Sequence, residues 1–528
     1  MKIKNLFLLI LTISISTFGH GLEQSIEKKS EQQKPKTVQT QTQKKPAPIK
    51  ESPNWWYQQG EGKVYQLAKE NPFPKKAKNV ILFIGDGMNI STITAARILE
   101  GQIKGETGEE NQLSFEKFPQ TALSKTYNTN LQTPDSAGTM SAMMTGVKTK
   151  AGVISVDGEV NNGDCDSGKK HSRMTLLELA EINGMSTGVV STAKITHATP
   201  AATYAHSVSR GWEADSDIPK AEREKGCKDI ATQLIEFSYG DGLEVALGGG
   251  RRNFLPKDAV DPEYPIWYGA RQDKRNLMDE WVNKYPSAKS IWNKTQFDAI
   301  DTKITKHLLG VFEPSHMQYE QDRKNDPAGE PSLSEMTSKS LEILKNSNKP
   351  FFLMVEAGRI DHGHHAGNAY RALTDTIELS NAVKVALEQI DLSETLIIVT
   401  ADHSHTFNIS GYPQRGNPIL GLVKQPNDSG EMVGELAKDA QGKPYTTLSY
   451  ANGPGYVNGD ERPDLTHVDT QSPDYKQAAT IPHMSETHSG EDVAIYATGA
   501  GSYTVHGTLE QNVIFHIMKH AIEDNLNQ

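Results

Sequence analysis

The 528-residue sequence is poor in cysteine, with only Cys165 and Cys227. So few cysteines argue against a thiolate metal site, and they leave a single possible disulfide. An even pair of cysteines in an exported chain is more often bridged than free, so we expect these two to form a disulfide. Basic residues are also in the minority, because 55 Lys and Arg face 66 Asp and Glu, for a formal net charge of -11. This balance argues against nucleic acid as a specific partner.

The apolar run at the N-terminus is short. It extends from Leu6 to Ile15, behind Lys2 and Lys4, and is well below the roughly 20 residues that span a bilayer. This arrangement is typical of a secretory signal peptide, and the alternative is a membrane anchor. We therefore predict that residues 1–21 are a signal peptide and that the protein is exported, either to a periplasm or out of the cell. The chain ends without an apolar tail, so no lipid anchor is expected on the mature form.

Residues 22–52 have few apolar side chains and are rich in Gln, Lys, Thr and Pro. Such a segment cannot bury enough surface to offset the entropy of ordering, so we predict a disordered linker. Ordered structure is expected to begin with a short amphipathic helix over residues 54–70. Its aromatic residues Trp55, Trp56 and Tyr57 are expected to dock on a partner subunit rather than on their own core.

Three apolar runs, at residues 79–85, 350–356 and 395–401, predict strands that are buried on both faces. Helical patterns lie between them, for example at 174–182 and 370–379. This alternation predicts an α/β fold, a three-layer α/β/α sandwich around a largely parallel sheet. In such sheets ligands bind beyond the carboxyl ends of the strands.

The composition changes over residues 406–480, which are rich in Gly, Pro, Asn and Tyr with only short strand-like pieces. We interpret this segment as an insertion on the sheet rather than as part of it. The catalytic domain is then expected to comprise residues 53–405 and 481–528.

Potential metal ligands follow several of the predicted strands. Asp361 and His365 are four residues apart, so a helix would present both to one zinc ion. Asp402 and His403 directly follow the strand at 395–401 and are candidates for a second zinc, and His488 lies before another apolar run. Each histidine alone has an equally good structural explanation. Three clusters near strand ends together indicate one shared metal site.

Two further motifs are weaker on their own. Asp86 lies between two glycines after the first predicted strand, and a tight turn would explain it as well as a metal does. Ser136, in the motif Thr-Pro-Asp-Ser-Ala-Gly-Thr, is a candidate nucleophile at the start of a helix. Serine is common, so this motif gains meaning only beside the others.

The motifs Gly-Asp-Gly, Asp-Ser-Ala, Thr-His-Ala-Thr-Pro-Ala, Asp-His-Gly-His-His, Thr-Ala-Asp-His and Glu-Thr-His occur in this order. The series resembles the alkaline phosphatase family from about residue 54 to near the C-terminus, and it is most similar to the animal-type branch. The resemblance implies a homodimer that hydrolyses phosphate monoesters to an alcohol and inorganic phosphate. It implies a covalent phosphoserine intermediate, two zinc ions, one magnesium ion and a broad range of small substrates. The segment 406–480 would form a crown over the dimer interface.

The resemblance also implies a role for individual residues. The metal ligands would be Asp361, His365 and His488 for one zinc, Asp86, Asp402 and His403 for the other, and Asp86, Thr199 and Glu356 for magnesium. Ser136 would be the nucleophile, and Arg210 would clamp the phosphate. His197 would lie behind the magnesium ligands and His362 near the phosphate, although both could equally be hydrogen-bonded spacers.

The animal-type branch has a structural calcium site, and the resemblance places it within residues 250–335. The matching ligands are Glu263, the Phe312 carbonyl, Glu313 and Glu330, and such oxygens suit a hard cation. Glu330 stands where the family usually has aspartate.

Two other functions remain open at this point. A sulfatase or phosphodiesterase of the same superfamily would share the metals, but a sulfatase needs a Cys/Ser-X-Pro-X-Arg motif, which the sequence at Ser136 lacks. Arg210 favours a monoester, whose extra negative charge the guanidinium would meet. A catalytically silent metal-binding or phosphate-binding protein is the second alternative, and against it every residue that the mechanism requires is present.

Overall fold

The structure is a computed structural model that describes residues 52–69, 76–431, 433–459 and 461–526. The predicted signal peptide and nearly all of the predicted linker lie outside the described residues, and both stay predictions. Across the ranges that are described, no helix combines the length and the apolarity needed to cross a membrane.

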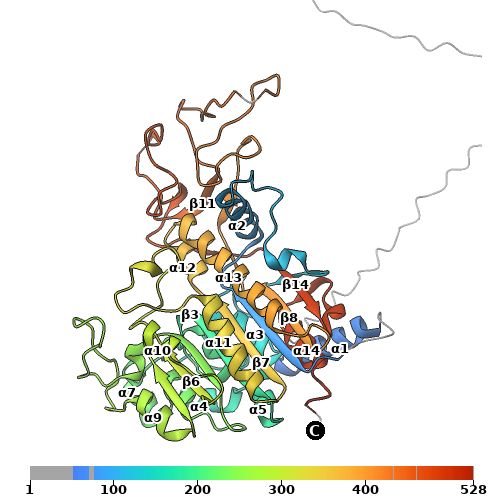
Figure 1. Cartoon of the computed structure of the whole chain (residues 1–528), viewed down its shortest axis with the longest axis vertical. Coiled ribbons are helices and arrows are strands. Elements are labelled where there is room, and N and C mark those ends of the chain that lie inside the picture. The colour runs from blue at the N-terminus through green and yellow to red at the C-terminus, as the bar shows by residue number, and fades with distance from the viewer. Residues whose placement is uncertain (1–51, 70–75, 432, 460, 527–528) are drawn as a thin grey trace, which may run out of the picture. The chain divides into compact units, whose positions relative to one another are not determined.

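A ten-stranded sheet forms the centre of the structure, in the order β15-β2-β14-β8-β1-β7-β3-β4-β6-β5 (Figure 1). Its strands are β1 (Asn79–Gly85), β2 (Gln120–Lys125), β3 (Ser186–Lys194), β4 (Val245–Gly249), β5 (Ala288–Ile291), β6 (His307–Val311), β7 (Phe351–Ala357), β8 (Thr395–Ala401), β14 (Val493–Gly499) and β15 (Gly507–Glu510). Only β14 is antiparallel to its neighbours, and all the other pairs are parallel. The prediction of a largely parallel sheet is confirmed.

Alternate residues of β1 pack into two separate hydrophobic cores. Val80 and Leu82 belong to one core, and Ile81 and Phe83 belong to the other. Because neighbouring side chains of a strand point to opposite faces, each core lies on one face of the sheet. Both faces are therefore covered, which is the reason that β1 reads as a continuous apolar run. This arrangement is the predicted three-layer sandwich.

Helices supply the outer layers of the sandwich. The first core includes residues of α3 (Ser136–Thr145), α5 (Leu176–Ile182), α6 (Ala198–Tyr204), α8 (Ile230–Ile235), α9 (Leu277–Lys284) and α14 (Val513–Ala521). The second core includes residues of α2 (Ile90–Ile103), α11 (Leu333–Asn346) and α13 (Ala369–Gln389). Besides α1, the other α-helices of the described residues are α4 (Cys165–His171), α7 (Lys220–Glu224), α10 (Lys294–Asp298) and α12 (Arg359–His365).

The N-terminal helix α1 (Pro53–Lys69) packs against α14 of its own chain. Trp56 is 2% exposed, its ring lies near that of Tyr127, and its carbonyl accepts a hydrogen bond of 2.9 Å from Asn512. Lys519 donates to the Tyr57 hydroxyl at 2.6 Å. The expectation that these aromatic residues dock on a partner subunit is therefore wrong for Trp56 and Tyr57, which find their contacts within the chain.

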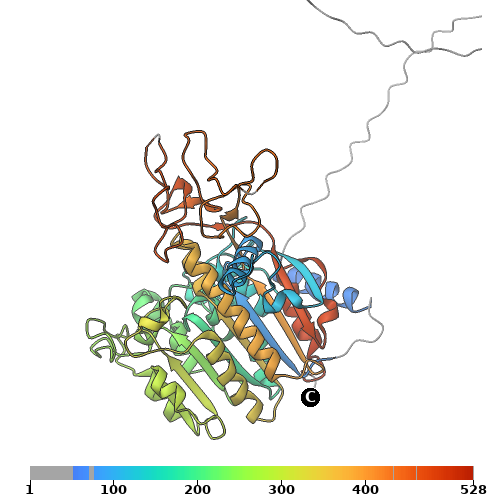
Figure 2. The same cartoon turned by 45° about the horizontal axis from the view of Figure 1, so that its top comes forward.

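The segment 406–480 contributes a small sheet of its own. Its strands are β10 (Phe407–Ile409), β11 (Leu448–Gly453) and β12 (Ala479–Pro482), and long loops join them. Figure 2 shows these loops beyond one end of the large sheet, next to α2 and α12. A two-stranded ladder of β9 (Ser404–His405) and β13 (His488–Ser489) joins the two ends of this segment. The ladder brings His488 to the strand end that carries His403.

Candidate metal centre

The carboxyl ends of three adjacent strands meet at one edge of the sheet. Ile84 of β1 is level with Glu356 of β7 and with Thr400 of β8. Asp86 and Asp402 therefore leave β1 and β8 side by side, beyond the strand ends. Burial is complete here, since Asp86, Glu356 and Asp402 are all 0% exposed.

The three predicted magnesium ligands each present a buried oxygen without a hydrogen-bond partner among the described residues. These atoms are Oδ2 of Asp86, Oγ1 of Thr199 and Oε1 of Glu356. Burial raises the pKa of Asp86 well above its usual value, and the charges of Asp402, Asp361 and Glu356 raise it further. Burial also raises the pKa of Glu356 to about 7. Buried oxygens that repel one another and lack donors fit a hard cation such as magnesium.

The ring nitrogens of His365 and His488 face each other. His365 Nδ1 lies 2.5 Å from the Glu486 carbonyl oxygen, and His488 Nδ1 lies 2.8 Å from that of Pro134. A carbonyl oxygen can only accept, so both Nδ1 atoms carry a proton, and each Nε2 atom is the ring nitrogen left to offer a lone pair to a metal. The two Nε2 atoms are 3.1 Å apart, at 3.4 and 3.3 Å from Asp361 Oδ1. These three atoms repel one another unless a cation lies among them, and nitrogen and carboxylate ligands suit zinc.

His403 forms a second group of this kind. Its Nδ1 lies 3.2 Å from the Ser404 carbonyl oxygen, which leaves the Nε2 lone pair free. This Nε2 lies 3.3 Å from Asp86 Oδ1 and 3.4 Å from Asp402 Oδ2. Burial lowers the pKa of His403 well below its usual value, so the ring is neutral and offers the lone pair to a metal. Asp86, Asp402 and His403 thus fit the second predicted zinc.

His405 joins the centre although the sequence motif gave it no role. Its Nε2 lies 2.7 Å from Asp361 Oδ1, and its Nδ1 lies 2.5 Å from Glu486 Oε2. Both neighbours are carboxylates, which raise the pKa of His405 to about 10 against the effect of burial. Both ring nitrogens therefore donate, so His405 cannot bind a metal through either of them. It orients Asp361 instead, through its Nε2. The contact of its Nδ1 with the distant Glu486 shows that the second ring nitrogen is also a donor.

Ser136 opens α3, as predicted. Asp135 is the N-cap residue, and its Oδ1 accepts a hydrogen bond of 3.1 Å from the backbone of Gly138. Ser136 Oγ lies 3.1 Å from His403 Nε2 and 3.5 Å from Asp86 Oδ1. The hydroxyl is therefore at a helix N-terminus, where the helix dipole and free N–H groups favour negative charge.

Arg210 reaches the same place from a distant loop. Its Nη1 donates to Asp135 Oδ2 at 3.1 Å, and its Nη2 donates to His197 Nε2 at 3.0 Å. Asp135 also accepts a hydrogen bond of 3.0 Å from the backbone of Gly152. The carboxylate that caps the helix of Ser136 therefore also orients the guanidinium.

His197 and His362 lie with a third histidine, His316, which was not predicted. One ring nitrogen from each lies within 4.8 Å of the others. In each ring, however, one nitrogen accepts from a fixed donor. Arg210 donates to His197, the backbone of Lys194 to His316 at 3.2 Å, and an arginine of α12 to His362 at 3.1 Å. The other nitrogen of each neutral ring then carries the proton, so the three rings offer donors and do not fit a metal.

Four carboxylates converge in the segment that the resemblance assigns to calcium, namely Glu263, Glu313, Glu330 and the unpredicted Asp326. The hydroxyl of Tyr264 lies 3.3 Å from Glu313 Oε1 and 3.2 Å from Asp326 Oδ1. Burial raises the pKa of Glu313 to about 8 and that of Glu330 well above its usual value. Asp326 Oδ2 and Glu330 Oε2 are buried and have no partner among the described residues. This donor set fits a calcium ion.

Arg251 supplies the nearest positive charge to this acidic cluster. It is fully buried and binds Asp261 through two nitrogens, at 2.8 and 2.7 Å, and Glu263 at 3.0 Å. It also donates to the Phe312 carbonyl at 2.6 Å, which leaves one lone pair of that oxygen for another partner. Arg251 is shared with Asp261 and does not balance all the carboxylates, which supports a bound cation.

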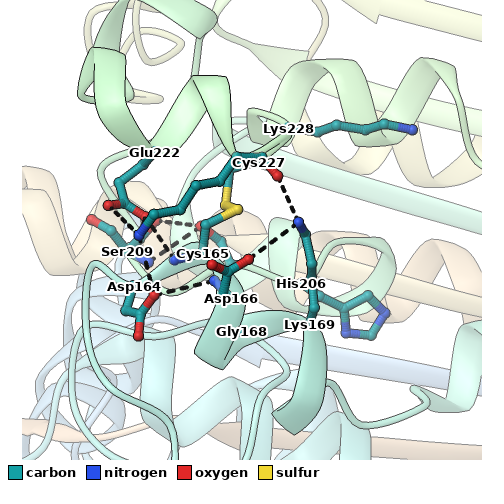
Figure 3. Close-up of a disulfide and its surroundings, with 12 residues drawn as sticks. Asp164, Cys165, Asp166, Gly168, Lys169, His206, Ser209, Glu222, Cys227 and Lys228 are labelled. Atoms are coloured by element: carbon teal, nitrogen blue, oxygen red, sulfur yellow. Dashed lines mark hydrogen bonds and ion pairs between the residues drawn. A yellow bond between two sulfur atoms is a disulfide. The ribbon is translucent and has the colours of Figure 1, made fainter.

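The predicted disulfide is confirmed. Cys165 and Cys227 are bonded, with 5.6 Å between their Cα atoms, and the bridge joins α4 to the segment between α7 and α8 (Figure 3). The backbone N–H of Cys165 donates to Glu222 at 2.9 Å. The same figure shows Lys169, His206 and Lys228 near the bridge.

Comparisons with known proteins agree in naming one family. A family model described as alkaline phosphatase matches residues 77–523. The tissue-nonspecific isozyme of alkaline phosphatase from Gallus gallus is 43% identical over 477 residues, covering 89% of each chain. The same isozyme from Homo sapiens is 42% identical over 477 residues, covering 89% of this chain and 88% of the human one.

Solved structures agree on the fold. Alkaline phosphatase from the Antarctic bacterium TAB5 has a TM-score of 0.58 at 23% identity and covers 86% of this chain and 100% of its own. Alkaline phosphatase from Thermus thermophilus has a TM-score of 0.60 at 23% identity, covering 85% of this chain and 92% of its own. At this identity the two structures support the architecture alone.

Proposed function

The chain belongs to the alkaline phosphatase family and is a metal-dependent hydrolase of phosphate monoesters, and from this premise we propose that Ser136 is the residue that takes the phosphoryl group. The observation that supports the assignment is the position of the Ser136 hydroxyl. It lies at a helix N-terminus, 3.1 Å from a histidine lone pair and 3.5 Å from a buried carboxylate oxygen. This position places a nucleophile next to two of the side chains that we assign to a metal, His403 and Asp86.

The ions themselves are assigned by the donor sets. We propose zinc between Asp361, His365 and His488, zinc between Asp86, Asp402 and His403, and magnesium at Asp86, Thr199 and Glu356. The bound ions neutralise the buried carboxylates, lower the pKa of the serine hydroxyl and stabilise charge on the oxygens of the transferred group.

The residues of the chain then carry out a double displacement. The oxygen of Ser136, once deprotonated, attacks phosphorus and forms an ester bond while the bond to the alcohol oxygen breaks, and the alcohol leaves with a proton. Water attacks the phosphoserine in the second step, so that Ser136 recovers its proton and inorganic phosphate is released. Arg210 presents two N–H donors in a planar fork to the phosphoryl oxygens in both steps.

The roles proposed for the residues of the centre all concern the phosphoryl group. None of them concerns the alcohol, so a broad range of small monoesters is expected. Inorganic phosphate fits the same donors as the transferred group, so we also expect product inhibition.

Three further assignments belong to this proposal. We propose calcium at Glu263, Glu313, Asp326 and Glu330, with the Phe312 carbonyl, because their charges are not balanced by Arg251. Export and a homodimer follow from the signal-like N-terminus and from the family resemblance. Sedimentation velocity of the purified protein would test the dimer.

The first experiment compares a chromogenic phosphate monoester with the matching diester and sulfate, before and after chelation, in wild type, Ser136→Ala and Ser338→Ala. Ser338 lies on α11, away from the centre, and serves as the control. We expect fast, chelator-sensitive hydrolysis of the monoester that collapses only in Ser136→Ala. Acid quenching with a labelled substrate should trap phosphate on Ser136. A labelled Ser136→Ala protein, or preference for the diester or sulfate, would overturn the assignment.

A further inference from the structure

A polar cavity of about 380 Å³ lies beside the catalytic centre. The residues that line it include Lys194, Gly211, Glu213, Arg252, Lys257 and Ser315. Two of these residues adjoin the centre, because Gly211 directly follows Arg210 and the backbone N–H of Lys194 donates to His316. The cavity and the catalytic centre therefore share a wall.

Two consecutive arginines have opposite environments at this cavity. Arg251 is fully buried and forms ion pairs with Asp261 and Glu263. Arg252 has no hydrogen bond or ion pair through its side chain within the described ranges, and its Nε is buried. Its guanidinium lies over the ring of Trp267, with 5.4 Å to the centroid. A buried guanidinium N–H without an acceptor costs free energy, so a native structure that keeps one usually has a ligand or water for it.

The other charges of the cavity do not supply that acceptor. Glu213 already forms an ion pair with Lys194 and accepts hydrogen bonds from Thr196 at 2.6 Å and Asn253 at 3.1 Å. Lys257 is exposed at the rim and forms no side-chain hydrogen bond or ion pair in the described part of the chain. Asp217, also at the cavity, accepts from a backbone N–H at 2.8 Å.

Positive charge thus exceeds negative charge in this cavity. Lys194, Arg252 and Lys257 outnumber Glu213 and Asp217 there, in a chain whose formal net charge is -11. Among the described residues, two of the three cations have no carboxylate partner, and one of these two presents a planar fork of donors. This combination is typical of sites for phosphate or sulfate.

We propose that Arg252 and Lys257 form a second anion site, which binds a tetrahedral oxyanion of the phosphate class. It is separate from the phosphate contacts proposed for Arg210, because Arg210 is not among the residues that line this cavity. The anion can come from two sources: a second anionic group on the leaving alcohol of a substrate, or a free oxyanion that binds next to the centre.

Calorimetry tests the site itself. Sulfate, which the centre does not hydrolyse, is titrated into the holoenzyme after one equivalent of vanadate per active site has filled the centre, so that no excess vanadate is left to occupy the second site. We compare wild type with Arg252→Gln, Lys257→Gln and the control Lys289→Gln, which changes an exposed lysine on β5 outside the cavity. A charge-assisted hydrogen bond contributes enough that each cavity variant should weaken sulfate binding about tenfold or more, while the control matches wild type.

Two results of the calorimetry would overturn the proposed site. Absence of sulfate binding to the vanadate-saturated wild type, or equal binding by wild type and both cavity variants, would overturn the site. Lys257 is exposed, so Lys257→Gln should fold normally and keeps the test valid if Arg252→Gln is unstable. Kinetics then identify the source. A selective loss of kcat/KM in Lys257→Gln for a monoester with an anionic leaving group supports a substrate subsite, and loss of sulfate binding alone supports a site for a free anion.

Discussion

Replacing Arg210 by alanine is expected to lower kcat/KM for phosphate monoesters about 10²- to 10⁴-fold. The structure holds the guanidinium in place before substrate arrives, through Asp135 at 3.1 Å and His197 at 3.0 Å. Two charge-assisted hydrogen bonds to the phosphoryl oxygens, each worth about 1.5–3 kcal/mol, give about 3–6 kcal/mol in total. Since about 1.4 kcal/mol corresponds to a factor of ten, the range of the rate loss follows. The inhibition constant of inorganic phosphate should rise in the same variant, because product binds the same fork.

Two variants sharpen this test. Arg210→Lys keeps the charge but not the planar fork, so its kcat/KM should fall between wild type and Arg210→Ala. Arg275→Ala is the control, because its side chain is 29% exposed against 30% for Arg210 and it binds carboxylates far from the centre. Steady-state kinetics with a chromogenic monoester measure all three. A loss of kcat/KM below about fivefold in Arg210→Ala, or full activity in Arg210→Lys, would refute the proposal that the planar guanidinium of Arg210 binds the phosphoryl oxygens.

Three predictions concern stability rather than catalysis. Changing Cys165 and Cys227 together to serine should lower the free energy of unfolding by about 4 kcal/mol, because the bridge closes a loop of 62 residues, and an unchanged urea midpoint would contradict this. Burial opposes the positive charge on His206, but the neighbouring Glu178 outweighs burial and raises the pKa of His206. The ion pair therefore stabilises the fold fully below about pH 6.5, and this stabilisation is lost as the pH rises through the raised pKa. His206→Gln should therefore lower the urea midpoint more at pH 5.5 than at pH 9. Arg251→Gln should lower the free energy of unfolding of the calcium-free protein by about 3–5 kcal/mol, because it leaves buried carboxylates unpaired. Added calcium should raise the thermal midpoint of the wild-type protein. Equal midpoints with and without calcium would count against a calcium site.

Much of the architecture follows from local pattern. The run at 79–85 reads as a strand buried on both faces because alternate residues enter two cores, and neither core tolerates a polar side chain there. Ser136 reads as a helix start because Asp135 before it is a strong N-cap residue. The spacing of Asp361 and His365 likewise predicts one helical face, which α12 provides.

The tertiary structure was needed wherever a role depends on which group faces which atom. His405 comes two residues after the predicted motif Thr-Ala-Asp-His, and only its contacts with Asp361 and Glu486 show that it is a donor on both sides rather than a metal ligand. Asp326 joins the acidic cluster because the fold brings it next to the hydroxyl of Tyr264. The helix α1 packs on its own chain because it contacts α14.

By itself, the sequence determined three central strands, the helix start at Ser136 and the residue types at the strand ends, because each of these depends on neighbours along the chain. It left a single possible disulfide because it contains only two cysteines. Only the tertiary structure decided which ring nitrogens carry lone pairs and which oxygens lack donors. Within the part of the chain that the structure describes, it also decided that Arg251 pairs with two carboxylates and Arg252 with none. Hydrogen-bond partners that are tens to hundreds of residues apart are chosen by packing, and no local pattern encodes them.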